Sequence, residues 1–166
     1  MDHKFTMSLS LNVLNHLGIN LYSNIPSVLS EIVANSWDAD AKTVWVTIND
    51  GEIIIEDNGC GMTEADINDH FLKVGYQKRE KEQKSPIFGR PFMGRKGIGK
   101  LSMFSIAKEV DVISRKTVDG KVEISALRMN VDKITEAIKN ENHSAERAYH
   151  PEVLPIDANS IDHEGR

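Results

Sequence analysis

The 166-residue sequence has 20 basic and 25 acidic residues, a formal net charge of −5, and 40% hydrophobic residues. Its length suits one domain with a sizeable core, and its composition is ordinary for a soluble globular protein. The negative charge argues against a domain that binds nucleic acid over its whole surface. No apolar run approaches the roughly 18 residues of a membrane span, so no membrane partner is expected. The single cysteine, Cys60, excludes an internal disulfide and favours a reducing, cytoplasmic location.

The chain opens with a predicted strand and two predicted helices. Apolar residues alternate with polar ones over residues 5–9, which predicts a short strand, and helical spacing follows over 11–17. Asn24, with Pro26 in the next turn, predicts the start of a second helix. The apolar stripe of this helix continues to about Asp38, where we expect it to end.

A β-hairpin and a capped helix come next. Two apolar runs, at 44–48 and 53–55, are joined by Asn-Asp-Gly at 49–51, a sequence that strongly predicts a hairpin turn. Thr63 predicts the N-cap of a further helix. The expected apolar face of that helix consists of Ile67, Phe71 and Val74.

Residues 77–92 have no hydrophobic periodicity and contain Pro86, Gly89 and Pro91. A loop of this length inside a compact domain tends to be a functional lid or a disordered segment, and we expect a mobile lid at about 77–93. A helix is then expected to begin near Gly97 and to carry Leu101, Phe104 and Ile106.

The last predicted elements are a second hairpin and a helix. Strands are predicted at 110–113 and 122–127, around an Asp-Gly turn at 119–120, and a helix is predicted at 131–139. The remainder is polar and predicts no strand of its own. We therefore expect 141–166 to be a partly disordered continuation of the domain, toward a final strand that the chain lacks.

This order of elements predicts an α+β fold, a two-layer sandwich in which helices cover a mixed, mostly antiparallel sheet. A doubly wound sheet would need crossover helices between successive strands, and two of the connections are too short for that. The domain is expected to occupy residues 1–140.

The first segment whose residues could take part in catalysis or metal binding is Glu31-Ile-Val-Ala-Asn35-Ser-Trp-Asp38-Ala39. Glu31 and Asn35 are four residues apart on a predicted helix, so they lie on the same face, one turn apart. A carboxylate can act as a base toward water, and an amide oxygen can bind magnesium. A solvated polar helix face would have the same spacing.

The second segment is Asp57-Asn-Gly59-Cys60-Gly61-Met62, directly after a predicted strand. An aspartate followed by two glycines lets the backbone approach a flat ligand closely, with the carboxylate ready to accept from an amine. An ordinary strand-to-helix turn is the alternative. Cys60 has no His or Cys partner at a suitable spacing and is interpreted as a small packed residue.

The third segment, residues 94–102, reads Gly-Arg-Lys-Gly-Ile-Gly-Lys-Leu-Ser. Its spacing is that of a P-loop, but Leu101 stands where a P-loop needs Ser or Thr to hold magnesium. A Rossmann motif fails as well, because Ser102 stands where the third glycine belongs. Glycines that expose backbone N–H groups before a helix still predict a phosphate site.

In this order and spacing, the three segments resemble the N box and the two glycine boxes of the GHKL ATPases. That family comprises gyrase, the heat-shock chaperones of the HSP90 type, histidine kinases and MutL, and its members share the Bergerat ATP-binding fold. The resemblance extends from about Leu9 to Arg115. The lead-in to the N box and its Trp-Asp-Ala-Asp-Ala ending are most similar to the chaperone, MORC and MutL side of the family.

The resemblance implies ATP and Mg²⁺ as cofactors. By analogy, Glu31 would be the general base that orients the attacking water, and Asn35 would be the magnesium ligand. Asp57 would accept a hydrogen bond from the adenine amino group, and Gly59 and Gly61 would make room for the base.

The resemblance also implies which residues face the phosphates. Gly97 and Gly99 would present backbone N–H groups, and Lys100 would add positive charge. Lys78 matches a lysine that several relatives carry in a Gly-x-Ser-x-Lys segment, although the serine is absent in this chain. The other nucleotide-binding candidates on these motifs are Asp38, Met62, Gly94 and Ile98.

The expected function is an ATP-hydrolysing conformational switch that forms an ATP-dependent homodimer within a longer protein. A histidine-kinase-type phosphotransferase is the first alternative, and Glu31 disfavours it because histidine kinases generally lack this glutamate. The second alternative is a non-catalytic module that binds nucleotide or nucleic acid. Residues 73–100, the basic segment, carry nine basic and two acidic residues, which makes nucleic acid a possible partner.

Overall fold

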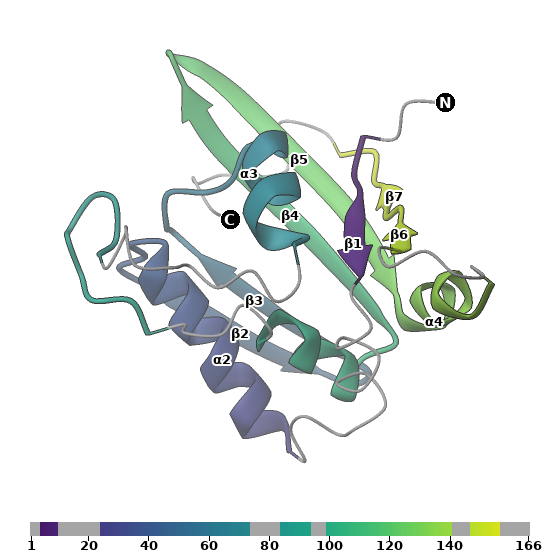
Figure 1. Ribbon diagram of the computed structural model, residues 1–166. Coiled ribbons are helices and arrows are strands. Elements are labelled where there is room, and N and C mark those ends of the chain that lie inside the picture. Colours follow the sequence, from purple (N-terminus) through teal and green to yellow (C-terminus); the bar gives the residue numbers. More distant parts are fainter. Residues whose placement is uncertain (1–3, 10–23, 74–83, 94–98, 141–146, 157–166) are drawn as a thin grey trace.

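The computed structural model describes residues 4–9, 24–73, 84–93, 99–140 and 147–156 (Figure 1). Within these residues the fold is α+β, with helices and antiparallel strands, as the sequence predicts. The elements in chain order are β1 (Met7–Leu9), α2 (Ile25–Asp38), β2 (Val44–Asn49), β3 (Glu52–Asp57), α3 (Glu64–Asp66), η1 (Ile67–Phe71), η2 (Gly99–Ser105), β4 (Glu109–Val118), β5 (Lys121–Asn130), α4 (Val131–Asn140), β6 (Arg147–Tyr149) and β7 (Glu152–Val153).

Helix α2 begins and ends where the sequence predicts. The Asn24 side chain accepts a 3.0 Å hydrogen bond from the backbone N–H of Ser27, and Pro26 lies in the first turn. This cap satisfies a backbone donor that would otherwise have no partner. At the other end, Asp40 adopts a left-handed backbone conformation, with φ of 63°. The chain therefore leaves the helix in a sharp turn at 38–41.

The predicted hairpins are both present. Strands β2 and β3 pair antiparallel through a turn in which Gly51 has φ of 80°, and β4 and β5 form a long hairpin, conspicuous in Figure 1. Among the described strands every pairing is antiparallel, and the strands form three separate hydrogen-bonded sheets, β1-β6, β2-β3 and β4-β5-β7. The expected antiparallel character is confirmed. The parallel pairing that a mixed sheet requires is not found among these residues.

Two short strands correct the expectation that no strand follows residue 141. Strand β6 pairs with β1, and β7 pairs with the end of β5. They contain three and two residues, which is too short for a period-two pattern to be recognised in a polar stretch. Tyr149 anchors β6, since its ring is buried and its hydroxyl accepts a 3.1 Å hydrogen bond from the Asn130 backbone N–H.

Thr63 caps α3 as predicted, in a capping box with Asp66. The continuation differs from the expected α-helix, because residues 67–71 form one π-helical turn, closed by a 2.7 Å bond from the Leu72 N–H to the Ile67 carbonyl. The wider turn places residues five apart on nearly the same side. Ile67 and Leu72 are consequently both fully buried. Val74 lies outside the described residues.

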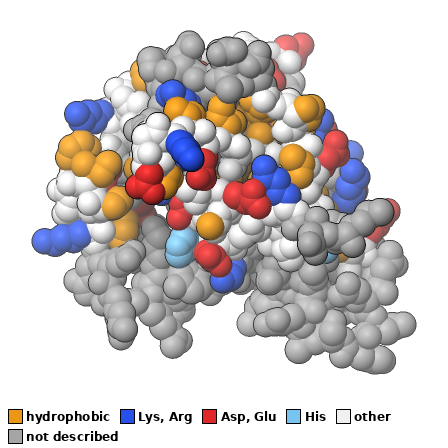
Figure 2. All heavy atoms as spheres, turned by 90° about the horizontal axis from the view of Figure 1, so that it is seen from above, with side chains coloured by type: hydrophobic (Ala, Val, Ile, Leu, Met, Phe, Trp, Pro, Cys, Tyr) orange, Lys and Arg blue, Asp and Glu red, His pale blue; other side chains and the backbone are white. Residues whose placement is uncertain are grey.

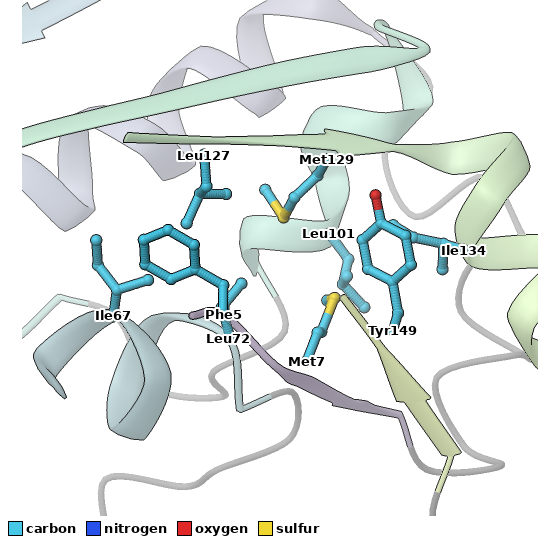
Figure 3. Close-up of a cluster of buried hydrophobic side chains, with 9 residues drawn as sticks. All are labelled: Phe5, Met7, Ile67, Leu72, Leu101, Leu127, Met129, Ile134 and Tyr149. Atoms are coloured by element: carbon cyan, nitrogen blue, oxygen red, sulfur yellow. The ribbon is translucent and has the colours of Figure 1, made fainter. Parts of the chain in front are cut away.

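The helix expected from Gly97 is a 3₁₀-helix, η2, which begins at Gly99. It lies against α2. Leu101 of η2 is buried in the main hydrophobic core, which Figure 3 shows in close-up. The core residues come from β1, η1, η2, β5, α4, β6 and the residues next to β1 and η1, and are Phe5, Met7, Ile67, Leu72, Leu101, Leu127, Met129, Ile134 and Tyr149. The core therefore holds η2, and through it α2, in a fixed place.

Candidate nucleotide-binding site

Glu31 and Asn35 lie one turn apart on α2, as the sequence predicts. Glu31 is half-buried and Asn35 is exposed. Neither side chain takes part in a hydrogen bond or ion pair within the part of the chain that the structure describes. None of the described residues therefore competes with a ligand for the carboxylate or the amide.

Both carboxylate oxygens of Asp57 accept hydrogen bonds, one from α2 and the other from the turn that follows β3. Ser36 Oγ donates a 2.9 Å hydrogen bond to Asp57 Oδ2, and the Gly59 backbone N–H donates a 2.8 Å bond to Asp57 Oδ1. These two bonds fix the orientation of the carboxylate, and each oxygen retains a second lone pair for a further donor. Ser36 was not among the predicted site residues. The sequence could have indicated Ser36, because it is a polar residue on the buried side of α2.

Gly59 lies where the turn after β3 approaches the end of α2. A Cβ atom at this position would lie 2.7 Å from the Ala39 carbonyl oxygen and 2.9 Å from Asp57 Oδ1. The neighbouring Cys60 N–H donates a 2.8 Å bond to the same Ala39 carbonyl. Glycine is therefore required for the contact between the two predicted motifs.

Gly61 has a different reason to be glycine. Its φ is 64°, and a Cβ atom would lie 2.0 Å from the backbone oxygen of Arg115 on β4. Met62, the next residue, donates a 2.7 Å hydrogen bond from its N–H to Ser114 Oγ, and its side chain packs against the hydrophobic core. The turn that carries Asp57 is thus held by α2 on one side and by β4 on the other.

Asp38, predicted to contact the nucleotide, is buried at the end of α2. Its Oδ1 accepts a 2.7 Å hydrogen bond from the backbone N–H of Met93, the residue before the second glycine box. The structure therefore gives Asp38 a role in holding the chain that enters that box.

Part of the predicted lid is bound to the rest of the domain. Residues 84–93 form a turn closed by an antiparallel bridge between Lys84 and Pro91. Asp40 accepts hydrogen bonds from Ser85 Oγ and from the backbone N–H of Ile87 at 2.6 Å and of Phe88 at 3.2 Å. Burial raises the pKa of Asp40, but these donors and nearby Arg90 outweigh it and hold that pKa below its ordinary value. The other predicted lid residues, 77–83, lie outside the described residues.

The remaining predicted phosphate contacts are only partly described. Lys78, Gly94, Gly97 and Ile98 lie outside the described residues. Gly99 and Lys100 begin η2, and η2 as an element packs against α2, the helix that carries Glu31.

The donor set suits a magnesium ion that is shared with phosphate. Among the described residues no group of three His, Cys, Asp or Glu side chains could hold a metal ion. Mg²⁺ is commonly bound by one or two protein oxygens together with substrate phosphates and water. The exposed Asn35 amide fits that kind of site.

No helix among the described residues is long and apolar enough to cross a membrane.

The sequence of this chain is similar to a family model and to several known proteins. A family model described as "Histidine kinase-, DNA gyrase B-, and HSP90-like ATPase" matches residues 22–162. A protein of Herpetosiphon aurantiacus named "Putative type II restriction enzyme HgiDII" is 50% identical over 115 residues, which are 69% of this chain and 19% of that protein. The chaperone protein HtpG of Rickettsia rickettsii is 30% identical over 68% of this chain and 22% of its own length. The corresponding values for HtpG of Ruthia magnifica are 30%, 58% and 20%.

The chain thus spans about a fifth of the length of these relatives. The residues matched by the family model include all three motifs. They also include the residues whose contacts join the motifs: Ser36 with Asp57, Gly59 with Ala39, and Asp38 with Met93. The chain belongs to the histidine kinase-, DNA gyrase B- and HSP90-like ATPases, the GHKL family.

Proposed function

We propose that this chain binds ATP with Mg²⁺, hydrolyses it, and so acts as a conformational switch for a longer protein. The observation that carries the proposal is the Asp57 carboxylate, held by Ser36 Oγ at 2.9 Å and by the Gly59 N–H at 2.8 Å. A carboxylate fixed in this way presents remaining acceptor capacity in a defined direction. The adenine amino group is a donor that matches it, so Asp57 would recognise the base.

Glu31 and Asn35 would provide the chemistry. Glu31 would accept a proton from a water molecule and orient that water toward the terminal phosphate. Asn35, one turn further along α2, would contribute an oxygen ligand to Mg²⁺. The metal ion, when bound, would neutralise charge on the phosphate oxygens. The absence of competing contacts of Glu31 and Asn35 within the described residues supports these roles.

The phosphates would lie at the second glycine box. The backbone N–H groups of glycines before a helix form an anion site, and Lys78 and Lys100 would add positive charge. Two contacts with α2 support this placement: the Asp38–Met93 hydrogen bond before the box and the packing of η2 after it. The residues proposed for the box itself are Gly94, Gly97, Ile98 and Gly99.

ATP would drive dimerisation of the longer protein. The lid, at about residues 77–93, would change conformation when the triphosphate binds. The histidine-kinase alternative is less favoured, because Glu31 offers a base for water that a phosphotransferase does not need.

A second candidate function is an ATP-operated domain of a protein that acts on DNA. Two observations favour it: the name of the HgiDII relative, which is 50% identical over 69% of this chain, and the net +7 charge of the basic segment, residues 73–100. On the face in Figure 2, acidic and basic side chains are interspersed with hydrophobic ones, which favours a local rather than a broad contact. DNA affinity that does not decrease with added salt would contradict this candidate.

The test of the main proposal is competition between nucleotides for the chain. Adenine offers an amino donor to Asp57, whereas guanine offers a carbonyl oxygen, and two facing acceptors cost about 1–3 kcal/mol. We expect ATP to bind about tenfold or more tightly than GTP, and Asp57→Asn to remove that preference. Equal affinity of the parent chain for ATP and GTP would contradict the role of Asp57.

A further inference from the structure

We propose that Asp40 is a positioning residue for the phosphates of the nucleotide, because it holds residues 84–93 on the end of α2. This inference rests on the proposed function, since it assigns the phosphates to the glycine box that follows Met93. Asp40 itself lies outside the set of residues expected to touch the nucleotide. Its role would be to fix where the chain enters the box.

The geometry of Asp40 is specialised for this contact. Its side chain is buried and accepts from three donors of the segment: Ser85 Oγ and the backbone N–H groups of Ile87 and Phe88. Its φ of 63° is a conformation that Asp and Asn adopt more readily than most other non-glycine residues. The turn at the end of α2 and the three bonds therefore depend on the same residue.

Arg90 holds the same segment, residues 84–93, at a second point. Its Nη1 donates a 2.6 Å hydrogen bond to the Ala41 carbonyl, and its guanidinium group lies 4.5 Å from the ring centre of Trp37 and 4.9 Å from that of Phe88. Trp37 Nε1 in turn donates a 3.0 Å bond to the Pro91 carbonyl. These two cation–π contacts and the Trp37 hydrogen bond add to the hydrogen bonds of Asp40.

These contacts act on the glycine box from its near end. Met93, the last residue of the segment, is bonded to Asp38 of α2, and η2 packs along α2 after the box. The residue before the box is thus bonded to the helix that carries Glu31 and Asn35, and η2, which begins at Gly99, packs against the same helix. Releasing the segment 84–93 would leave one end without its attachment to the proposed catalytic helix.

Asp40→Asn tests the inference with little change in shape. Asparagine retains the preference for the left-handed conformation, but it replaces one accepting oxygen with an amide donor. Oδ1 accepts from Ser85 and Phe88 and Oδ2 accepts from Ile87, so at least one of the three donors loses its acceptor and the segment is held less firmly. Asp119→Asn is the matched control, because Asp119 also has a positive φ, of 50°, and is exposed in the β4–β5 turn. Ser85→Ala, which removes one donor, is a milder variant.

The measurements are the affinities for ATP and for adenosine, and amide hydrogen exchange at Ile87 and Phe88. We expect Asp40→Asn to weaken ATP by about tenfold, a typical coupling between two sites, to leave adenosine unchanged, and to accelerate exchange at both amides. Ser85→Ala should shift ATP affinity in the same direction by less. Asp119→Asn should match the parent in every measurement.

Three results would overturn the inference. One is an Asp40→Asn variant that exchanges faster at Ile87 and Phe88 and still binds ATP like the parent. Another is an equal loss of ATP and adenosine affinity in Asp40→Asn and Ser85→Ala, which would indicate a general structural role. The third is a parent chain that binds neither ligand. That result would refute the proposed function itself, and it is distinguished from the others because the parent, rather than a variant, fails.

Discussion

The hydroxyl of Ser36 on α2 donates a 2.9 Å hydrogen bond to Oδ2 of Asp57 at the end of β3. Ser36 and Asp57 are separated by 21 residues in the sequence, and this contact connects the motif of Glu31 and Asn35 with the motif of the two glycines. The residue proposed to recognise adenine is thereby oriented by the helix proposed to carry the catalytic groups.

Ser36→Ala should therefore weaken both folding and ATP binding. A hydrogen bond to a charged acceptor contributes about 1.5–3 kcal/mol, and its loss leaves Asp57 Oδ2 without this donor. Denaturant unfolding and ATP titration would measure the two effects. Ser102→Ala is the control: the Ser102 hydroxyl is buried and has no hydrogen-bond partner among the described residues, so removing it should not lower stability. Unchanged ATP affinity in Ser36→Ala would separate Ser36 from the proposed site.

Glu31→Gln should abolish most hydrolysis while ATP remains bound. The amide keeps the size of the side chain but cannot accept a proton from water, and loss of a general base typically lowers the rate by about 100- to 10,000-fold. Single-turnover hydrolysis and an equilibrium binding assay would measure rate and affinity separately. Glu52→Gln, an exposed change at the start of β3, should leave both at the parent value. Parent-like hydrolysis by Glu31→Gln would mean that another group is the base.

Asn35→Ala should remove the dependence of ATP binding on magnesium. The side chain would no longer offer an oxygen to the metal, whereas the contacts of Asp57 with the base would remain. ATP titrations with Mg²⁺ and with a chelator should differ for the parent chain and coincide for the variant. A variant that still gains affinity from Mg²⁺ would exclude Asn35 as a required ligand.

Gly61→Ala should destabilise the domain by about 2–4 kcal/mol, in the range of other overpacked and strained positions. The new Cβ atom would lie 2.0 Å from the Arg115 backbone oxygen, so the turn after β3 must move. Gly120→Ala is the matched control, because Gly120 has φ of 75° but no atom lies within 4 Å of the place that its new Cβ atom would take. It measures the cost of the positive φ alone. Equal losses of unfolding free energy in the two variants would rule out the predicted collision.

Asp66→Asn should lower stability at neutral pH and matter less in acid. Burial raises the pKa of Asp66, but its bonds to Lys116 and to Thr63 outweigh it and hold that pKa below the ordinary value. A depressed pKa adds stability above the pKa of the unfolded chain, and this contribution is lost as the pH falls through the folded value, below about pH 4. Urea unfolding of parent and variant at several pH values would measure the difference.

The control for this pH effect is Asp69→Asn. Asp69 pairs with Lys73 on the surface, and both side chains are about half exposed or more. Exposed pairs contribute about 0–1 kcal/mol, so this variant should differ little from the parent at any pH. If the gap between parent and Asp66→Asn stayed constant down to acid pH, the Asp66–Lys116 pair would not be the source of the stability.

Local signals predicted most of the elements of this fold. Asn24 with Pro26 marked the start of α2, and Thr63 marked that of α3, because caps depend only on residues within one helical turn. The turn at 49–51 likewise predicted the β2–β3 hairpin. The π-helical turn at 67–71 and the strands β6 and β7 were missed. The turn and β6 depend on contacts with the distant core, and β7 depends on pairing with the distant strand β5.

The same limit applies to the site. The order of the three motifs indicated the GHKL family, which the family match over residues 22–162 confirms. The roles of Glu31, Asn35 and Asp57 stay predictions. The importance of Asp40 and Arg90 could not be inferred from the sequence, because their partners lie more than forty positions away along the chain.

The hairpins, the capped helices and the family could be predicted from short stretches of sequence, because each follows from a pattern within a few residues. Which distant side chains meet depends instead on the packing of the whole domain. It joined Ser36 to Asp57 and seated residues 84–93 on Asp40. It also placed Gly61 against Arg115, a contact that leaves no room for a side chain. Such contacts depend on how the core positions α2, β3 and β4 relative to one another. Burial of apolar surface drives that packing, but it is not directional, so no short stretch of sequence specifies the arrangement.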